Sequence, residues 1–249
     1  MKKIVFLLLA TLLLPATMFA EKNNEPSPQQ LAIYKEDITG NAEEETIELT
    51  GLPFADNTGY YVDTWASLVG NDGKKREIQF SGGYKPQLLF HDLNHDGIKD
   101  ILYQSVSEKT SKLHHYQLYT FDNGHLKKMP FPEQKFIKTM FKNNFTVEVQ
   151  VAPDKDPAIV DVSDHATKYV HQGIYDENGK LLEKTSPMIQ PISNVKPVKI
   201  SEQKGYGLKS EQPISGAYPE ERLGTVETLW YFEKGQWIIL KTEWISDDK

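Results

Sequence analysis

The sequence predicts a mainly β fold, and three observations support this prediction. Short runs rich in Val, Ile, Thr, Tyr and Phe recur along the chain, often alternating with polar residues, as half-buried strands require. Asn-Gly and Asp-Gly pairs of the kind that close β-hairpins stand between several of these runs. These turn signals return at a nearly constant interval of about 54 residues, and a fixed interval of this size predicts an internal repeat.

The runs expected to form strands share β-branched and aromatic residues. They are residues 46–49, 60–69, 76–80, 101–106, 116–121, 145–151, 158–162, 169–175, 226–232 and 237–242. One segment differs, because its apolar residues Phe136, Ile137, Met140 and Phe141 share one face of a helix. We therefore expect one short helix near residues 132–142.

The turn glycines are almost evenly spaced along the chain, at Gly73, Gly124, Gly179 and Gly235. This spacing predicts about four repeats, roughly residues 33–85, 86–138, 139–193 and 194–249. Four such repeats fit a small β-propeller-like fold. An open stack of hairpins or a β-sandwich is the alternative.

Residues 1–20 have the order of an export signal. Lys2 and Lys3 precede an apolar run over residues 4–14, which is shorter than the ~20 residues needed to cross a bilayer. We expect cleavage after Ala20, with an uncleaved N-terminal anchor as the alternative. The sequence thus predicts a signal peptide over 1–20, a single β-repeat domain over 21–249, and a location outside the cell or in its envelope.

Composition limits the chemistry and the partners of the chain. The absence of cysteine excludes disulfides and thiolate chemistry. A formal net charge of −7 disfavours nucleic acid and anionic lipid surfaces, which both select clustered Lys and Arg. We expect an extracellular protein or glycan as partner, with no stable membrane insertion after signal cleavage; the sequence does not predict the oligomeric state.

One segment carries most of the chemical information. Oxygen-bearing side chains occupy its positions 1, 3, 5 and 9: Asp92, Asn94, Asp96 and Asp100. The carbonyl of Ile98 stands at position 7, and Gly97 at position 6 permits a sharp bend. Calcium prefers six to eight hard oxygen ligands, so the segment predicts a calcium site. The alternative is a turn whose Asp and Asn side chains cap their own backbone.

A related segment begins one repeat interval earlier, with candidate ligands Asp37, Thr39, Asn41, Glu43 and Glu45. Asn41 replaces a carboxylate there, and Ala42 replaces the glycine. We therefore expect at most a weak second metal loop. A fourth loop near residue 200 should hold no ion, because Lys199 takes the place of its first aspartate.

The pattern D-x-[DNT]-x-D-G-x-x-[DE] before a strand resembles the FG-GAP or VCBS-type repeats of integrin-like propellers and secreted bacterial proteins. Residues 92–100 match it at every position. The resemblance implies calcium binding by the matched residues Asp92, Asn94, Asp96, Ile98 and Asp100, and β-propeller architecture. The overall layout also resembles uncharacterised secreted proteins of Bacillus relatives. An EF-hand is excluded, because Tyr103 stands where the twelfth-position Glu belongs.

No catalytic residue is predicted. The chain has no G-x-S-x-G motif and no phosphate-binding glycine loop, and His91 and His95 do not have zinc-ligand spacing. The favoured function is a non-enzymatic, calcium-binding interaction module. The alternative is an extracellular hydrolase with an unrecognised active site, which a pocket of converging carboxylates or histidines would favour.

Overall fold

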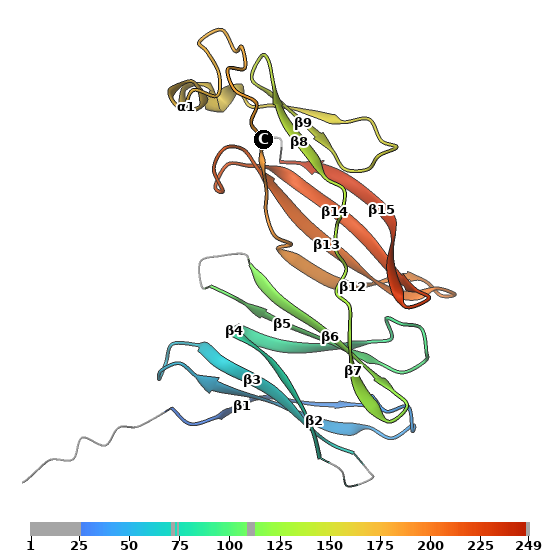
Figure 1. Ribbon diagram of the computed structural model, residues 1–249. Coiled ribbons are helices and arrows are strands. Elements are labelled where there is room, and N and C mark those ends of the chain that lie inside the picture. Colours follow the sequence, from blue (N-terminus) through green and yellow to red (C-terminus); the bar gives the residue numbers. More distant parts are fainter. Residues whose placement is uncertain (1–25, 71–72, 74, 109–112, 248–249) are drawn as a thin grey trace, which may run out of the picture.

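The computed structural model describes residues 26–70, 73, 75–108 and 113–247 (Figure 1). The predicted signal peptide and its cleavage site lie outside these residues. The mainly β class is confirmed, since the described residues form three antiparallel sheets of seven, three and five strands. No helix in the described part of the chain has the length and apolar character needed to cross a bilayer.

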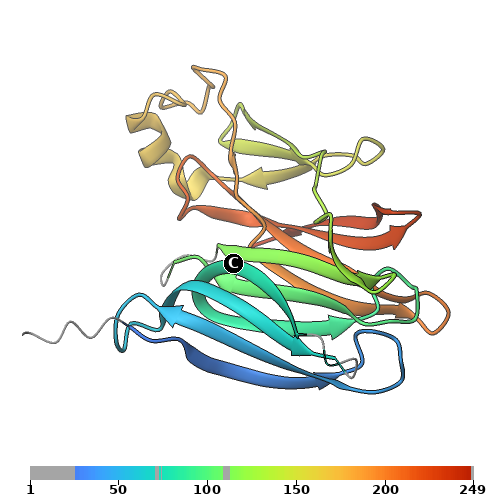
Figure 2. The same cartoon turned by 60° about the horizontal axis from the view of Figure 1, so that its bottom comes forward.

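The N-terminal unit is one seven-stranded sheet in which each strand pairs with the next in the chain. Its strands are β1 (Gln29–Glu36), β2 (Glu45–Pro53), β3 (Tyr60–Val69), β4 (Lys75–His91), β5 (Asp100–Val106), β6 (His114–Asp122) and β7 (His125–Met129). Figure 2 shows that this sheet is strongly curved. The residues of this sheet form a core cluster that includes Ile47, Leu49 and Tyr103.

The C-terminal unit contains the other two sheets and a short helical segment. The small sheet comprises β8 (Lys138–Lys142), β9 (Thr146–Gln150) and β10 (Ala158–Asp161), and the helical segment η1 (Ser163–His165) and α1 (Ala166–His171). The five-stranded sheet comprises β11 (Met188–Ile189), β12 (Asn194–Ser201), β13 (Gly205–Ser215), β14 (Arg222–Glu233) and β15 (Gln236–Ser246). A buried cluster with Phe141, Tyr169 and Val226 joins these parts.

Apolar packing also joins the two units. Leu102 and Leu118 of the curved sheet share a buried cluster with Leu208 and Trp230 of the five-stranded sheet. The five-stranded sheet lies between the curved sheet and the small sheet in Figure 1. The molecule is therefore a stack of sheets with a buried cluster at each contact between sheets and a third cluster within the curved sheet.

The predicted division into four repeats does not match the sheets. Strand β4 runs through the expected boundary at residues 85–86, and one sheet takes up residues 29–129. No closed ring of four blades forms among the described residues, and the open stack of hairpins is the better description. The evenly spaced glycine turns therefore do not mark structural repeats: those at 123–124 and 234–235 close hairpins in different sheets, and the one at 178–179 closes no hairpin.

The sequence-based prediction is wrong for two segments: a predicted helix is a strand, and a predicted strand begins in a helix. Residues 138–142 form strand β8, where Phe141 is fully buried and Met140 is 42% exposed. That alternation of burial is the period of a strand, so the apolar spacing that indicated a helix near 132–142 was misleading. Residues 169–175, expected as a strand, instead begin within α1 and leave it in a turn.

Two of the predicted hairpin turns are confirmed. The pairs at 123–124 and 234–235 have positive φ at both residues and join β6 to β7 and β14 to β15, as two-residue hairpin turns require. The pair at 178–179 closes only an isolated bridge between Tyr175 and Leu181. Residues 71–72 of the first signal lie outside the described residues.

Candidate metal site

The segment Asp92–Asp100 connects β4 to β5, and Asp100 is the first residue of β5. The Asp92 carboxylate accepts the backbone N–H of His95 through Oδ1 at 2.7 Å, and that of Gly97 through Oδ2 at 3.1 Å. His95 and Gly97 both have positive φ, of 66° and 89°. The aspartate thus holds a tight bend, as in a turn that caps its own backbone.

The side chains at positions 3 and 5 continue this network. Asp96 Oδ1 accepts the N–H of Ile98 at 2.8 Å, and Asn94 Oδ1 accepts the N–H of Asp96 at 3.0 Å. Asn94 Nδ2 donates to Asp96 Oδ2 at 2.9 Å and to Thr120 Oγ1 at 3.0 Å. Each oxygen keeps a second lone pair, so these bonds leave the oxygens able to bind a cation.

Asp100 is the unusual member of the loop. It is 1% exposed, and its Oδ2 accepts the N–H groups of Leu93 and Asn94 at 2.8 and 3.0 Å. Its Oδ1 is buried and makes no hydrogen bond of normal geometry among the described residues, although the Thr120 side chain lies near enough to the carboxyl to lower its pKa. Burial raises the pKa of this carboxyl from 3.8 to about 6, against the hydrogen bonds that it accepts. A buried anionic oxygen of this kind is costly without a partner.

The loop does not, however, close around a single point. Within the described ranges, no group of three or more His, Cys, Asp or Glu side chains is arranged to hold a metal ion. The donor set itself suits calcium, because it consists of carboxylate, amide and carbonyl oxygens. The fit therefore rests on the chemistry of these donors and on the unpartnered oxygen of Asp100.

The first loop repeats this hydrogen-bonding plan between β1 and β2. Asp37 accepts the N–H groups of Gly40 and Ala42 at 2.7 and 2.9 Å, and both donors have positive φ. Asn41 Oδ1 accepts the N–H of Glu43 at 2.8 Å. The buried Glu45 closes the loop, since its Oε2 accepts the N–H of Ile38 at 3.0 Å.

The two loops differ in the hydrogen bonding of the second oxygen of this buried carboxylate. Glu45 Oε1 accepts the hydroxyl of Thr39 at 2.8 Å, whereas the corresponding oxygen of Asp100 is unpartnered. All five candidate positions of the first loop thus lie in one turn, and its buried carboxylate is already satisfied. This arrangement needs no ion.

The curvature of the sheet brings the two loops into contact. The Lys99 ammonium pairs with the carboxylate of Glu36 at 2.5 Å. The side chain of Ile98 lies so close to Gly40 that a Cβ on this glycine would be 2.6 Å from it. A change in the second loop would therefore be felt by the first.

The second loop also contacts the C-terminal unit, through His95. The sequence analysis considered this histidine only as a zinc ligand and excluded it. The ring nitrogens of His95 lie 3.1 Å from the carbonyl oxygen of Phe232 and 2.8 Å from that of Tyr206. The ring also stacks on Tyr231, with centroids 4.4 Å apart. The bend held by Asp92 thus places His95 between β13 and β14.

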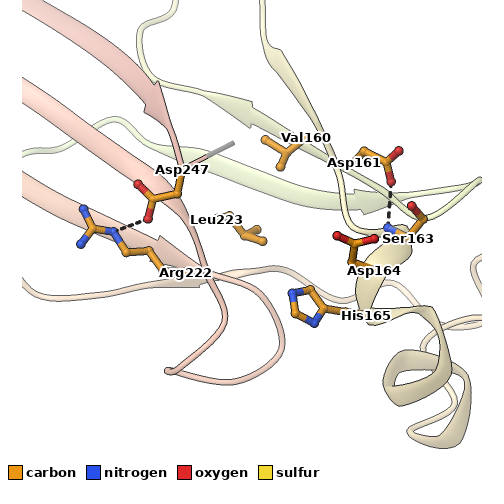
Figure 3. A pocket seen from close by; sticks show the side chains of 8 residues that line it. All are labelled: Val160, Asp161, Ser163, Asp164, His165, Arg222, Leu223 and Asp247. Carbon is orange, nitrogen blue, oxygen red and sulfur yellow. Dashed lines mark hydrogen bonds and ion pairs between the residues drawn. The ribbon is translucent and has the colours of Figure 1, made fainter. Parts of the chain in front are cut away.

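A polar hollow in the C-terminal unit is the second candidate site, and sequence reasoning missed it. Its volume is about 400 Å³, and Figure 3 shows its lining of Val160, Asp161, Ser163, Asp164, His165, Arg222, Leu223 and Asp247. These residues come from three segments far apart in the chain, and none belongs to a recognisable motif. No local signal in the sequence brings them together.

The geometry of this hollow limits what it can catalyse. Arg222 Nε pairs with Asp247 Oδ2 at 2.6 Å, and the N–H of Ser163 donates to Asp161 Oδ1 at 2.8 Å. This backbone hydrogen bond lowers the pKa of Asp161. Among the described residues, Ser163 makes no hydrogen bond to His165, as an activated serine nucleophile would. Asp164 and His165 are the remaining candidates for proton transfer.

The fold and the loops together define a class: a mainly β protein of stacked antiparallel sheets that carries two acidic turn loops of one design. Residues 135–245 match a family model described as the YybI C-terminal domain. The match begins in the link between β7 and β8, so its boundary coincides with that between the two units.

The chain is also similar to "Uncharacterized protein YybI" of Bacillus subtilis (strain 168). The two are 21% identical over 199 residues, which cover 78% of this chain and 76% of that protein. This similarity extends beyond the C-terminal unit. No solved structure matches the chain.

Proposed function

We propose that this protein is a secreted calcium-binding β protein that acts as a non-enzymatic binding module at or outside the cell envelope. The observation that carries the calcium proposal is the buried, unpartnered Oδ1 of Asp100. A divalent cation would supply the partner that this oxygen lacks and would offset the cost of burying it.

The ligands would be the side chains of Asp92, Asn94, Asp96 and Asp100, together with the carbonyl of Ile98. The three carboxylates repel one another, and a bound ion would reverse that repulsion. Binding requires these side chains to draw together from the hydrogen-bonded arrangement of the structure. The first loop would bind weakly or not at all, because the Thr39 hydroxyl already satisfies Glu45.

Kinship with FG-GAP or VCBS-type repeats is part of this proposal for the loops alone. Support comes from two turns, one repeat interval apart in the chain, that share the same hydrogen bonds. The β-propeller architecture is not retained, since β4 and its sheet run through the expected blade boundary. Secretion rests on the basic and apolar order of residues 1–20.

The test of the calcium site is thermal unfolding in EDTA and then in excess calcium. Calcium at about 100 times its dissociation constant should stabilise the protein by roughly 2.7 kcal/mol. The variant Asp100→Asn keeps an acceptor for the two amides but should lose this response. Glu45→Gln, the matched change in the first loop, should retain it. An unfolding temperature that is the same in EDTA and calcium would refute the calcium site.

An extracellular hydrolase is the second candidate, and the hollow beside Asp164 and His165 favours it. These side chains could exchange a proton with a substrate bound there. The test is release of soluble fragments from cell-wall extracts by the wild-type protein and by His165→Ala. Hydrolysis that the variant loses would support an enzyme, and no hydrolysis by either protein would favour the binding module.

A further inference from the structure

An open hollow lies on the N-terminal unit, at the far end of β5 from the second loop. It has a volume of about 620 Å³ and is lined by Phe54, Thr58, Tyr60, Tyr84, Ser107 and Glu108. Strand β5 runs from Asp100 in the loop to Val106 beside the hollow, which corresponds to roughly 20 Å. The hollow is therefore separate from the candidate calcium site.

The lining residues come from neighbouring strands of the curved sheet and from the connections between them. The N–H of Phe54 donates to the carbonyl of Tyr60 at 2.9 Å and so closes the connection between β2 and β3. Tyr60 and Tyr84 face each other across β3 and β4, with ring centroids 5.1 Å apart and planes at 65°. Two of the rings thus form a corner, and Phe54 provides a third wall.

The backbone holds this corner tightly. A Cβ at Gly82 would lie 2.3 Å from the carbonyl oxygen of Tyr61, and a Cβ at Gly83 would lie 2.7 Å from that of Val106. Only glycine permits such a close approach of β4 to both neighbours. Tyr84 follows directly after these two residues, so its position is fixed by the sheet.

The hollow has a distinct polar character. The Thr58 hydroxyl donates to the carbonyl of Ala55 at 2.9 Å, and that of Ser107 to the carbonyl of Leu113 at 3.1 Å. These donors are therefore engaged by the protein itself. Among the described residues, Glu108 is the only charged side chain in the lining. Its negative charge and the three aromatic rings of the lining both favour a positively charged ligand.

Phe54 adds a second reason to expect a ligand. Its side chain is 66% exposed, the largest exposure among the exposed large apolar residues of the described chain. A large ring in water at the rim of a hollow would gain from contact with the methyl or methylene groups of a ligand. An alkylammonium group combines such groups with a positive charge.

We propose that this hollow binds the alkylammonium group of a small ligand, with Phe54, Tyr60 and Tyr84 around the cation and Glu108 as its counter-charge. Aromatic cages bind quaternary ammonium ions in this way. The assignment is independent of calcium binding, because the two sites share no residue.

The experiment is an NMR titration of residues 21–249, the chain expected after signal cleavage. Tetramethylammonium and choline are the ligands, and the aromatic ring resonances are observed. The neutral carbon isostere 3,3-dimethyl-1-butanol serves as the comparison ligand, and Nα-acetyl-lysine amide tests a lysine side chain as the source of the ammonium. Phe54→Ala and Glu108→Gln are the variants. Leu182→Ala, an exposed apolar residue of the C-terminal unit at 58% exposure, is the control.

The wild-type protein should bind choline saturably. Each of the two variants should bind choline roughly tenfold more weakly, and the wild type should bind the isostere roughly tenfold more weakly than choline. The control variant should bind choline as the wild type does. Preference for choline over the lysine compound would assign a quaternary ligand, and the reverse preference a primary one. Equal binding of choline and its isostere would overturn the proposal, because the hollow would then be only apolar. Binding of an N-acetylglucosamine oligomer in the absence of any ammonium binding would also overturn it.

Discussion

The two acidic loops of the N-terminal unit are built on one hydrogen-bonding plan and differ at one buried oxygen. In each loop the first aspartate accepts the N–H groups of the fourth and sixth residues, which both have positive φ. In each, the ninth residue is a buried carboxylate that accepts the N–H of the second. The scaffold of the turn is therefore common to both.

The difference lies at the third and ninth positions. Thr39 donates its hydroxyl to Glu45 Oε1 in the first loop. In the second loop Asn94 donates its amide to Asp96 and Thr120, and Asp100 Oδ1 is left without a partner among the described residues. The first loop thus has a donor of its own for its buried carboxylate, whereas Asp100 has only the Thr120 side chain of a neighbouring strand near its second oxygen.

The largest expected effect concerns the pH dependence of stability in calcium-free solution. Folding raises the pKa of Asp100 to about 6, so the folded state holds this proton more tightly than the unfolded state. The contribution of Asp100 is most favourable below pH 4 and is lost as pH rises through about 6, by roughly 3 kcal/mol. Asp100→Asn should remove this loss.

The measurement is urea unfolding in EDTA from pH 4 to pH 7 for the wild type, Asp100→Asn and Glu45→Gln. The other acids titrate in all three proteins, so the difference between wild type and Asp100→Asn isolates the one carboxyl. A constant difference across this range would show that Asp100 Oδ1 has a partner in solution and that the two loops are alike.

A smaller effect should follow if the first loop loses its internal donor. Thr39→Val keeps the shape of the side chain but leaves Glu45 Oε1 buried without its hydrogen bond, which should cost about 2 kcal/mol. Urea unfolding in EDTA would measure this loss, with the exposed Thr46→Val in β2 as control. Equal stability of the two variants would mean that the Thr39 hydroxyl does not complete the first loop.

The smallest effect compares the sixth positions. Ala42 has φ 64° and Gly97 has φ 89°, a region that costs alanine about 1 kcal/mol relative to glycine. Gly97→Ala should therefore destabilise the protein by about this amount, since its Cβ would meet nothing within 4 Å. Ala42→Gly should stabilise it slightly or leave it unchanged. The free energy of unfolding of each variant measures these effects. If Gly97→Ala were stabilising and Ala42→Gly destabilising, the two bends would differ in backbone conformation.

The predicted strands lie largely where the structure has them, because alternation and β-branched residues report directly on a half-buried strand. The exchange at residues 138–142 and 169–175 shows the limit of this signal. Short apolar runs fit both periods. Pairing with β9 makes residues 138–142 a strand, whereas Tyr169 lies in α1 and packs against Phe141 from there.

The sequence by itself determined the chemistry of the loops. Asp, Asn and Gly at fixed spacing produce the same turn twice, since each side chain bonds to backbone only two to seven residues away. Tertiary structure decided what such local rules do not reach: that β4 continues through the expected repeat boundary, that Asp100 is buried with one oxygen unpartnered, and that three distant segments meet at His165. Burial and contacts between distant segments depend on how the sheets curve and stack, and neither is encoded within the span of a single turn.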